Sequence, residues 1–121
     1  MKKIIKKLNE QTVSPNGLVY TEEIIKEIYN QVKDRELIGE FGQDSNRPKK
    51  EVVNLMNASL ISKNYRIEDG NLVADIKFIG DKKDLLENGL IDYEFGIRAL
   101  TKNNSMEAKD LKVITFDLIQ K

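Results

Sequence analysis

The chain has 121 residues, of which 40% are apolar and 33% are charged, and its 20 basic and 20 acidic side chains cancel. This length and composition predict one soluble globular domain, residues 1–121, and exclude a disordered chain. The balanced charge argues against nucleic acid as the main partner, because binding a phosphate backbone needs clustered Lys and Arg. Cysteine and histidine are both absent, which excludes disulfides, thiolate or imidazole metal sites, and histidine-based catalytic dyads.

The first half of the chain predicts a short strand-like start, a helix and a strand. "KKIIKKL" (2–8) is amphipathic; it suits a membrane-binding or partner-binding helix, but a solvated first strand or helix is favoured. No apolar run approaches the roughly 20 residues that span a bilayer, so we expect an intracellular protein without a membrane partner. "SPNG" (14–17) predicts a turn. Thr21, followed by apolar residues at helical spacing, predicts a helix over 21–34, and "ELIGEF" (36–41) predicts a strand.

The second half predicts mostly strands. Residues 42–50 are polar and contain Pro48, which indicates an exposed loop. Residues 51–61 fit either a helical turn or the start of a strand. Two strands then follow, joined by Asp69-Gly70, the dipeptide that tight hairpins prefer. Residues 81–89 predict a short helix that stops at Gly89. Strands over 91–100 and 111–119 flank a loop at 102–110. The whole predicts an α+β fold with an antiparallel, barrel-like sheet and about two helices.

Taken in order, these segments resemble the prohead (capsid-maturation) proteases of tailed bacteriophages, serine proteases whose fold is related to herpesvirus assemblin. Proteins of that family carry "L-G-E-L-x-H-P", "G-V-S-S-R-G" and a closing "T-x-D-V/I-V". The counterparts here are "LIGEFGQD", "EFGIRALT" and "VITFDLI", with "NGLVYTEEIIKEIYNQ" and "NASLISKNYRIEDGNLVADIKFI" between or before them. The similarity covers about residues 14–119. The resemblance implies the assemblin-like fold.

The departures from the family fall on its catalytic residues. The position of the catalytic histidine is Gln43, and the proline after it is Asp44. The two serines, one of them the nucleophile, fall on Gly96 and Ile97, and only the arginine is kept, as Arg98. Glutamine cannot act as the base and glycine has no hydroxyl to attack with. The resemblance therefore implies a protein that is not an enzyme and needs no cofactor or metal.

The same residues also have structural interpretations. Without the resemblance, Gln43 and the residue after it are solvated surface. A glycine within a strand, such as Gly96, usually marks a bulge or a close approach of backbones. Arg98 is either an oxyanion donor left from an active ancestor or an ion-pair partner of Glu94 or Glu40. The ion pair is favoured, because an oxyanion donor has no role without a nucleophile.

The resemblance implies a structural role in a tailed-phage capsid, in the virion after assembly in the host cytoplasm. We expect an auxiliary (decoration) protein whose partners are the major capsid protein or other virion and prohead proteins, with self-association. One alternative is an assembly regulator that binds an active prohead protease. Another is a peptidase with a non-standard nucleophile, such as Ser59 or Ser62 paired with a lysine.

Overall fold

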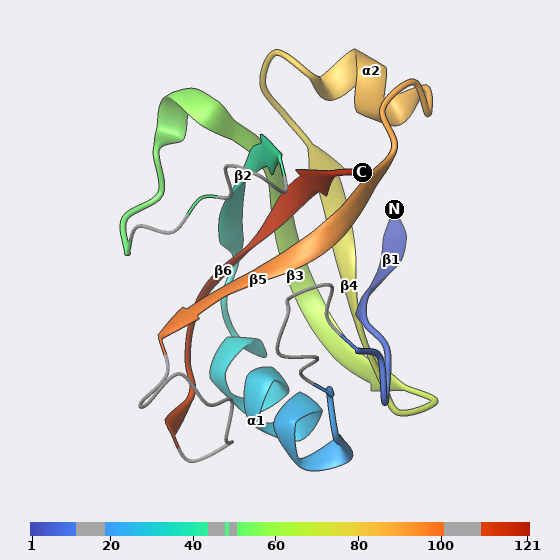
Figure 1. The fold of residues 1–121 in the computed structure, drawn as a ribbon, viewed down its shortest axis with the longest axis vertical. Helices are drawn as coiled ribbons and strands as arrows, with labels where there is room; N and C mark the ends of the chain where they lie inside the picture. Colours follow the sequence, from blue (N-terminus) through green and yellow to red (C-terminus); the bar gives the residue numbers. More distant parts are fainter. Residues whose placement is uncertain (12–18, 44–47, 49–50, 101–109) are drawn as a thin grey trace.

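The computed structural model describes residues 1–11, 19–43, 48, 51–100 and 110–121. Within them, six strands form one sheet with the order β1-β4-β3-β2-β6-β5, accompanied by two α-helices (Figure 1). The elements are β1 (Lys2–Lys6), α1 (Glu22–Val32), β2 (Leu37–Gln43), β3 (Ala58–Glu68), β4 (Asn71–Phe78), α2 (Lys83–Glu87), β5 (Tyr93–Leu100) and β6 (Lys112–Gln120). The sheet curls into a half-barrel, so the predicted α+β class is confirmed.

The prediction of an antiparallel sheet is wrong for one pair of strands. β2 and β6 run parallel, with Phe41 beside Leu118 and Gln43 beside Gln120, whereas every other pair is antiparallel. Parallel neighbours need a long connection. Here that connection consists of β3, β4, α2 and β5, after which β6 inserts between β2 and β5. The sheet is therefore mixed.

The predicted hairpin between β3 and β4 is confirmed. Asp69 and Gly70 both have positive φ, 53° and 79°, as the two central residues of a tight hairpin turn require. Beyond the turn, Leu72, Ala74 and Ile76 are buried at every second position of β4. This alternation puts one side of the hairpin into the hydrophobic core.

Helix α1 confirms the helix predicted over 21–34, although it ends earlier, at Val32. The Thr21 hydroxyl caps it by accepting a hydrogen bond from the backbone N–H of Ile24, at 3.3 Å. The apolar stripe, which includes Ile24, Ile28 and Val32, is buried in the core of the protein. In Figure 1 the helix lies across the lower end of the curled sheet.

Other segments differ in detail from their predictions. The loop predicted over 42–50 begins later, because Gly42 and Gln43 are still paired with β6. Residues 51–61 satisfy both alternatives: a 3₁₀ turn, η1 (Leu55–Asn57), leads directly into β3. Helix α2 spans only part of the helix predicted over 81–89. The turn predicted at 14–17, and the loops at 44–50 and 102–110 except Pro48 and Asp110, lie outside the described residues.

The two edge strands of the sheet approach each other through a lysine. Lys6, on β1, is buried, and its ammonium donates a 2.8 Å hydrogen bond to the carbonyl of Phe95 on β5. The same ammonium lies 4.9 Å from the centre of the Tyr20 ring, within cation–π range. The start of the chain therefore joins the sheet as a strand, as the favoured interpretation of "KKIIKKL" expects, and Lys6 bridges the opening of the half-barrel.

Candidate functional site

The positions that the resemblance matches to the histidine and to the two serines do not meet in the structure. Gln43 ends β2 and lies in register with Gln120 of β6, which in turn faces Tyr93 of β5. Gly96 is three residues further along β5, in register with Asp117. Strand spacing and residue rise then put Gln43 about 14 Å from Gly96. A base and its nucleophile need hydrogen-bond contact, which this register does not provide.

The surroundings of these positions are those of ordinary strand residues. Gln43 is exposed, whereas Gly96 is buried and Ile97 is partly buried beside the core. The irregularity of β5 falls between Arg98 and Ala99. The bulge that a strand glycine predicts is therefore not at Gly96. Asp44 lies outside the described residues.

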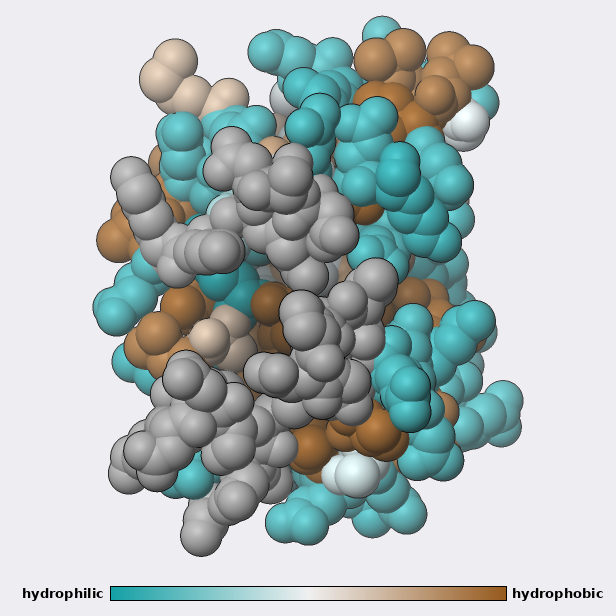
Figure 2. Space-filling model, viewed as in Figure 1, coloured by the Kyte–Doolittle hydropathy of each residue, from teal (hydrophilic) through white to brown (hydrophobic). Residues whose placement is uncertain are grey.

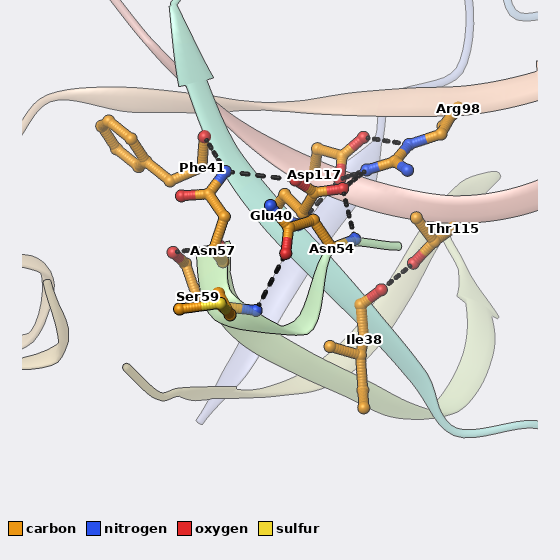
Figure 3. Close-up of polar contacts among 10 residues, drawn as sticks. Ile38, Glu40, Phe41, Asn54, Asn57, Ser59, Arg98, Thr115 and Asp117 are labelled. Carbon is orange, nitrogen blue, oxygen red and sulfur yellow. Dashed lines mark hydrogen bonds and ion pairs between the residues drawn. The ribbon is translucent and has the colours of Figure 1, made fainter. Parts of the chain in front are cut away.

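Arg98 is the member of the set that the structure places in a defined polar site (Figure 3). Its Nε donates to Oδ2 of Asp117 at 3.0 Å, and its Nη2 donates to Oδ1 of the same carboxylate at 2.7 Å. Nη2 also donates to Oε2 of Glu40 at 2.9 Å. All three side chains are buried. The predicted ion pair of Arg98 is thus confirmed with Glu40, and Asp117 is its second acidic partner.

Glu40 connects this ion pair to the segment before β3. Its Oε2 accepts a hydrogen bond from the backbone N–H of Asn54 at 3.0 Å, and its Oε1 accepts one from the Asn57 amide at 3.2 Å. Asn57 also donates to the carbonyl of Phe41 at 2.8 Å. The Glu40 carboxylate therefore fixes residues 54–57 against the end of β2, as Figure 3 shows.

The backbone of β2 takes part in the same network. The N–H of Glu40 donates to Oδ1 of Asp117 at 2.8 Å. One residue earlier, Gly39 packs so closely on β6 that a Cβ there would lie 1.8 Å from the carbonyl oxygen of Phe116. Two residues before Asp117 on β6, the Thr115 hydroxyl donates a hydrogen bond to the carbonyl of Ile38 at 2.7 Å. Glycine at position 39 therefore lets β2 lie close enough for these bonds to form.

The environment shifts two pKa values in opposite directions. Burial raises the pKa of Glu40, but hydrogen bonds from Asn54, Arg98 and Asn57, with the charge of Arg98, outweigh it and lower the pKa below 4.5. Burial opposes the charge of Arg98, but the hydrogen bonds and charges of Asp117 and Glu40 outweigh it and raise its pKa above the ordinary value of arginine. Glu40 and Arg98 are therefore both charged at neutral pH.

This cluster, Glu40–Arg98–Asp117, is suited to holding strands together. Each of the four carboxylate oxygens accepts at least one hydrogen bond from within the protein. A carboxylate with such partners is a poor general base, because accepting a proton would break them. Arg98 is already paired with two carboxylates, so it is likewise poorly placed to stabilise the negative charge of a further anion. The cluster therefore links β2, β5 and β6.

The two serines proposed as alternative nucleophiles are also engaged with polar partners other than lysine. The Ser59 hydroxyl donates to the carbonyl of Asn57 at 3.2 Å. The Ser62 hydroxyl hydrogen bonds to the phenol of Tyr65 in the interior. Across the part of the chain that the structure describes, neither serine has a lysine ammonium as its hydrogen-bond partner, so the serine–lysine dyad has no geometric support there.

Sequence reasoning missed three members of the network: Asp117, Asn54 and Asn57. A usable signal existed for Asp117, which interrupts the apolar closing strand "VITFDLI". An acidic residue within a strand that is otherwise apolar predicts a buried carboxylate, and such a group needs a cationic partner. The two asparagines gave no comparable signal, because their role depends on how the segment before β3 folds back.

Comparisons with models of protein families, with curated proteins and with solved structures found no match to this chain. Among the described residues, no helix is long and apolar enough to cross a membrane. The same residues contain no group of three or more acidic side chains arranged to hold a metal ion.

Proposed function

We propose that the protein is a non-catalytic component of a tailed-phage capsid, most simply an auxiliary (decoration) protein that binds the major capsid protein. The proposal rests on the resemblance to the prohead proteases together with one structural observation. Arg98, the residue that the family's serine motif retains, is held by the buried carboxylates of Glu40 and Asp117. Holding the strands of the sheet together is thus a sufficient role for Arg98, and no contact with a substrate is needed to explain it.

The residues at the other matched positions support the same proposal. Gln43 and Gly96 supply neither a base nor a nucleophile, and the register separates them. The described residues at the matched positions form no reactive pair, while the polar cluster between the strands holds the interior fixed, and such a fold can present a constant surface for a partner to recognise. The proposal needs no contact between the two matched positions, since it assigns no reaction to them.

The decisive experiment is quantitative mass spectrometry of purified virions and of proheads from the same infection. A decoration protein is expected in mature virions in a fixed ratio to the major capsid protein. Presence in proheads with loss on maturation would instead indicate an internal assembly factor. Absence from both particles, with co-purification of an active prohead protease, would replace the proposal by the regulatory alternative.

Residual peptidase activity needs a separate test. The purified protein is incubated with a fluorophosphonate probe and with the capsid and scaffold proteins, and no labelling or cleavage is expected. Ser59→Ala and Ser62→Ala are the matched variants. Labelling that disappears in one of them would identify a nucleophile and overturn the non-catalytic proposal.

A further inference from the structure

Strand β5 is the last strand at one edge of the sheet, and every second residue turns its backbone groups away from β6. The N–H of Lys121 donates to the carbonyl of Asp92 at 3.0 Å, and this pair continues the register of β5 with β6. In an antiparallel ladder, the residues that exchange backbone hydrogen bonds alternate with residues that do not. Counting from Asp92, the N–H and C=O groups of Tyr93, Phe95 and Ile97 therefore form the free edge of β5.

A free edge of this kind pairs with a strand of another molecule unless something blocks it, and proteins commonly block it with lysine, proline or a bulge. Besides Lys6, the other edge strand, β1, contains Lys2 and Lys3. Figure 2 shows mainly hydrophilic residues along the right side of the molecule, where β1 lies in Figure 1. β5, "YEFGIRAL", contains neither lysine nor proline, and its irregularity comes only after Arg98. The regular part of β5 therefore has no such protection in its own sequence.

The ammonium of Lys6 occupies the middle of the free edge of β5. It donates to the carbonyl of Phe95 at 2.8 Å, and Phe95 is the central residue of that edge. Lys6 is only 6% exposed, and its ammonium also lies 4.9 Å from the centre of the Tyr20 ring. A strand that paired with β5 would have to displace the ammonium from this carbonyl. A buried cation would then lose one of its acceptors, which is costly.

We propose that Lys6 protects β5: its ammonium prevents the free edge of this strand from pairing with β5 of a second copy. A second copy fits this edge, because two identical antiparallel strands related by a twofold axis present donors and acceptors to each other at the same spacing. The side chains of Tyr93, Phe95 and Ile97 are only partly buried against the core, so such pairing would also cover apolar surface. Lys6 has this role whatever partner the protein binds, and the capsid proposal can therefore fail separately.

Sedimentation equilibrium of Lys6→Met tests this role directly. Methionine is a flexible side chain that fills irregular space in a core but carries no charge. The variant is expected to self-associate at least about tenfold more tightly than the wild type, because pairing no longer displaces a buried cation. Its average mass should rise with concentration from 13.9 kDa toward twice that value.

Lys7→Met is the matched control, because it removes an exposed lysine at the next position in the chain. It should associate no more tightly than the wild type. Equal association of Lys6→Met and the wild type would overturn the protective role of Lys6. Stronger association of Lys7→Met as well would also overturn it, because the effect would then follow from net charge.

Hydrogen exchange of the backbone amides shows where the copies meet. In the wild type, the amides of the free edge, at Tyr93, Phe95 and Ile97, should exchange faster than those of Glu94 and Gly96, which face β6. In associated Lys6→Met the three edge amides should become protected. Similar protection of both sets in the wild type would mean that β5 has no free edge, and this measurement holds even if Lys6→Met does not fold. Association without new protection at the edge amides would place the contact elsewhere and contradict the proposal.

A proline at position 97 should reverse the association. Ile97→Pro removes an N–H that points away from β6, so the bonds between β5 and β6 remain, but the outer edge can no longer pair. The double variant Lys6→Met with Ile97→Pro is expected to associate no more than the wild type, with circular dichroism showing that it is folded. A folded double variant that still associated like Lys6→Met would overturn the assignment of the contact to β5.

Discussion

Arg98 and Asp117 form a two-pronged ion pair between neighbouring antiparallel strands, with Nε to Oδ2 at 3.0 Å and Nη2 to Oδ1 at 2.7 Å. In the register of β5 and β6, Arg98 faces Thr115, so Asp117 is its diagonal neighbour. The guanidinium continues past β6 to Glu40 on β2. One side chain therefore connects three adjacent strands, including the single parallel pair in the sheet.

Removing this guanidinium should destabilise the fold strongly. Arg98→Met leaves two buried carboxylates without a counter-ion, which typically costs about 3–5 kcal/mol of the free energy of unfolding. Arg98→Lys should recover little of the loss, because an ammonium cannot make the two-pronged contact. Urea unfolding at neutral pH, followed by circular dichroism, measures both variants.

The matched control is a surface arginine with acidic partners. Arg66 lies 3.2 Å from Asp75 and 3.5 Å from Glu68, but its side chain is 38% exposed. Water already solvates such a pair, so Arg66→Met should cost less than about 1 kcal/mol. Equal losses for Arg66→Met and Arg98→Met would show that burial of the cluster contributes nothing.

The lowered pKa of Glu40 predicts an acid-dependent part of the stability. Because the folded-state pKa lies below 4.5, this contribution is fully present above pH 4.5 and is lost as the pH falls through the folded value. Glu40→Gln should be less stable than the wild type at pH 7, and the difference should shrink toward about pH 3. Glu68 and Asp75 also have lowered pKa values, but they are present in both proteins and cancel.

Unfolding free energies of the wild type and Glu40→Gln, measured across this pH range, check the sign. Asp75→Asn is the comparison variant. Asp75 also has a lowered pKa, but it lies near the surface, where Asn64 and Arg66 donate hydrogen bonds to its carboxylate. A Glu40→Gln difference that stayed constant from pH 7 to about 3 would contradict the assignment of that acid dependence to Glu40.

Local patterns predicted much of the fold because they act over a few residues. Thr21 caps α1 and Asp69-Gly70 turns the hairpin, and each effect is encoded by adjacent side chains. The parallel pairing of β2 and β6 was not predictable in this way. It depends on which strands meet after the chain has folded back, with Phe41 and Leu118 far apart in sequence.

The polar cluster was predictable only in part, for a similar reason. The unusual arginine in a strand suggested an ion pair, and Glu40 was one of two candidates. The other, Glu94, is closer in sequence, but the pairing of β5 with β6 turns Arg98 toward Asp117 and Glu40. Such contacts depend on which strands pair and in which register. That pairing joins residues that are distant in the chain, and local patterns in one sequence do not predict it.

Gly39 should be intolerant of any side chain. A Cβ there would lie 1.8 Å from the Phe116 carbonyl and 2.5 Å from a methyl group of Leu60, so β2 and β6 would have to separate. Gly39→Ala should therefore cost at least about 3 kcal/mol. Gly89→Ala meets no atom within 4 Å and bears only the strain of a positive φ of 70°, about 1 kcal/mol. Thermal unfolding that ranked these two variants in the opposite order would contradict the close packing.

Tyr65 should make the protein sensitive to alkali. Burial raises the pKa of Tyr65 to about 12, against the lowering effects of its hydrogen bond with Ser62 and the charge of Arg35. Its contribution is therefore fully present below pH 10 and is lost as the pH rises from 10 to 12. Tyr65→Phe should lose less stability than the wild type between about pH 10 and 12. Tyrosinate absorbance and urea unfolding measure the two effects, and parallel losses in both proteins would contradict the assignment.

Introducing the side chains that the resemblance matches to catalytic residues should not produce catalysis. The double variant Gln43→His with Ile97→Ser supplies the base and one of the two hydroxyls that the resemblance implies, yet β6 separates their strands and the register offsets them. Because a serine hydroxyl needs a base in hydrogen-bond contact, a fluorophosphonate probe should label this variant no more than the single variant Ile97→Ser. Circular dichroism confirms that both variants are folded. Labelling of the double variant that disappeared when position 43 was returned to glutamine would mean that the two positions can meet, and would contradict the strand register on which the non-catalytic proposal partly rests.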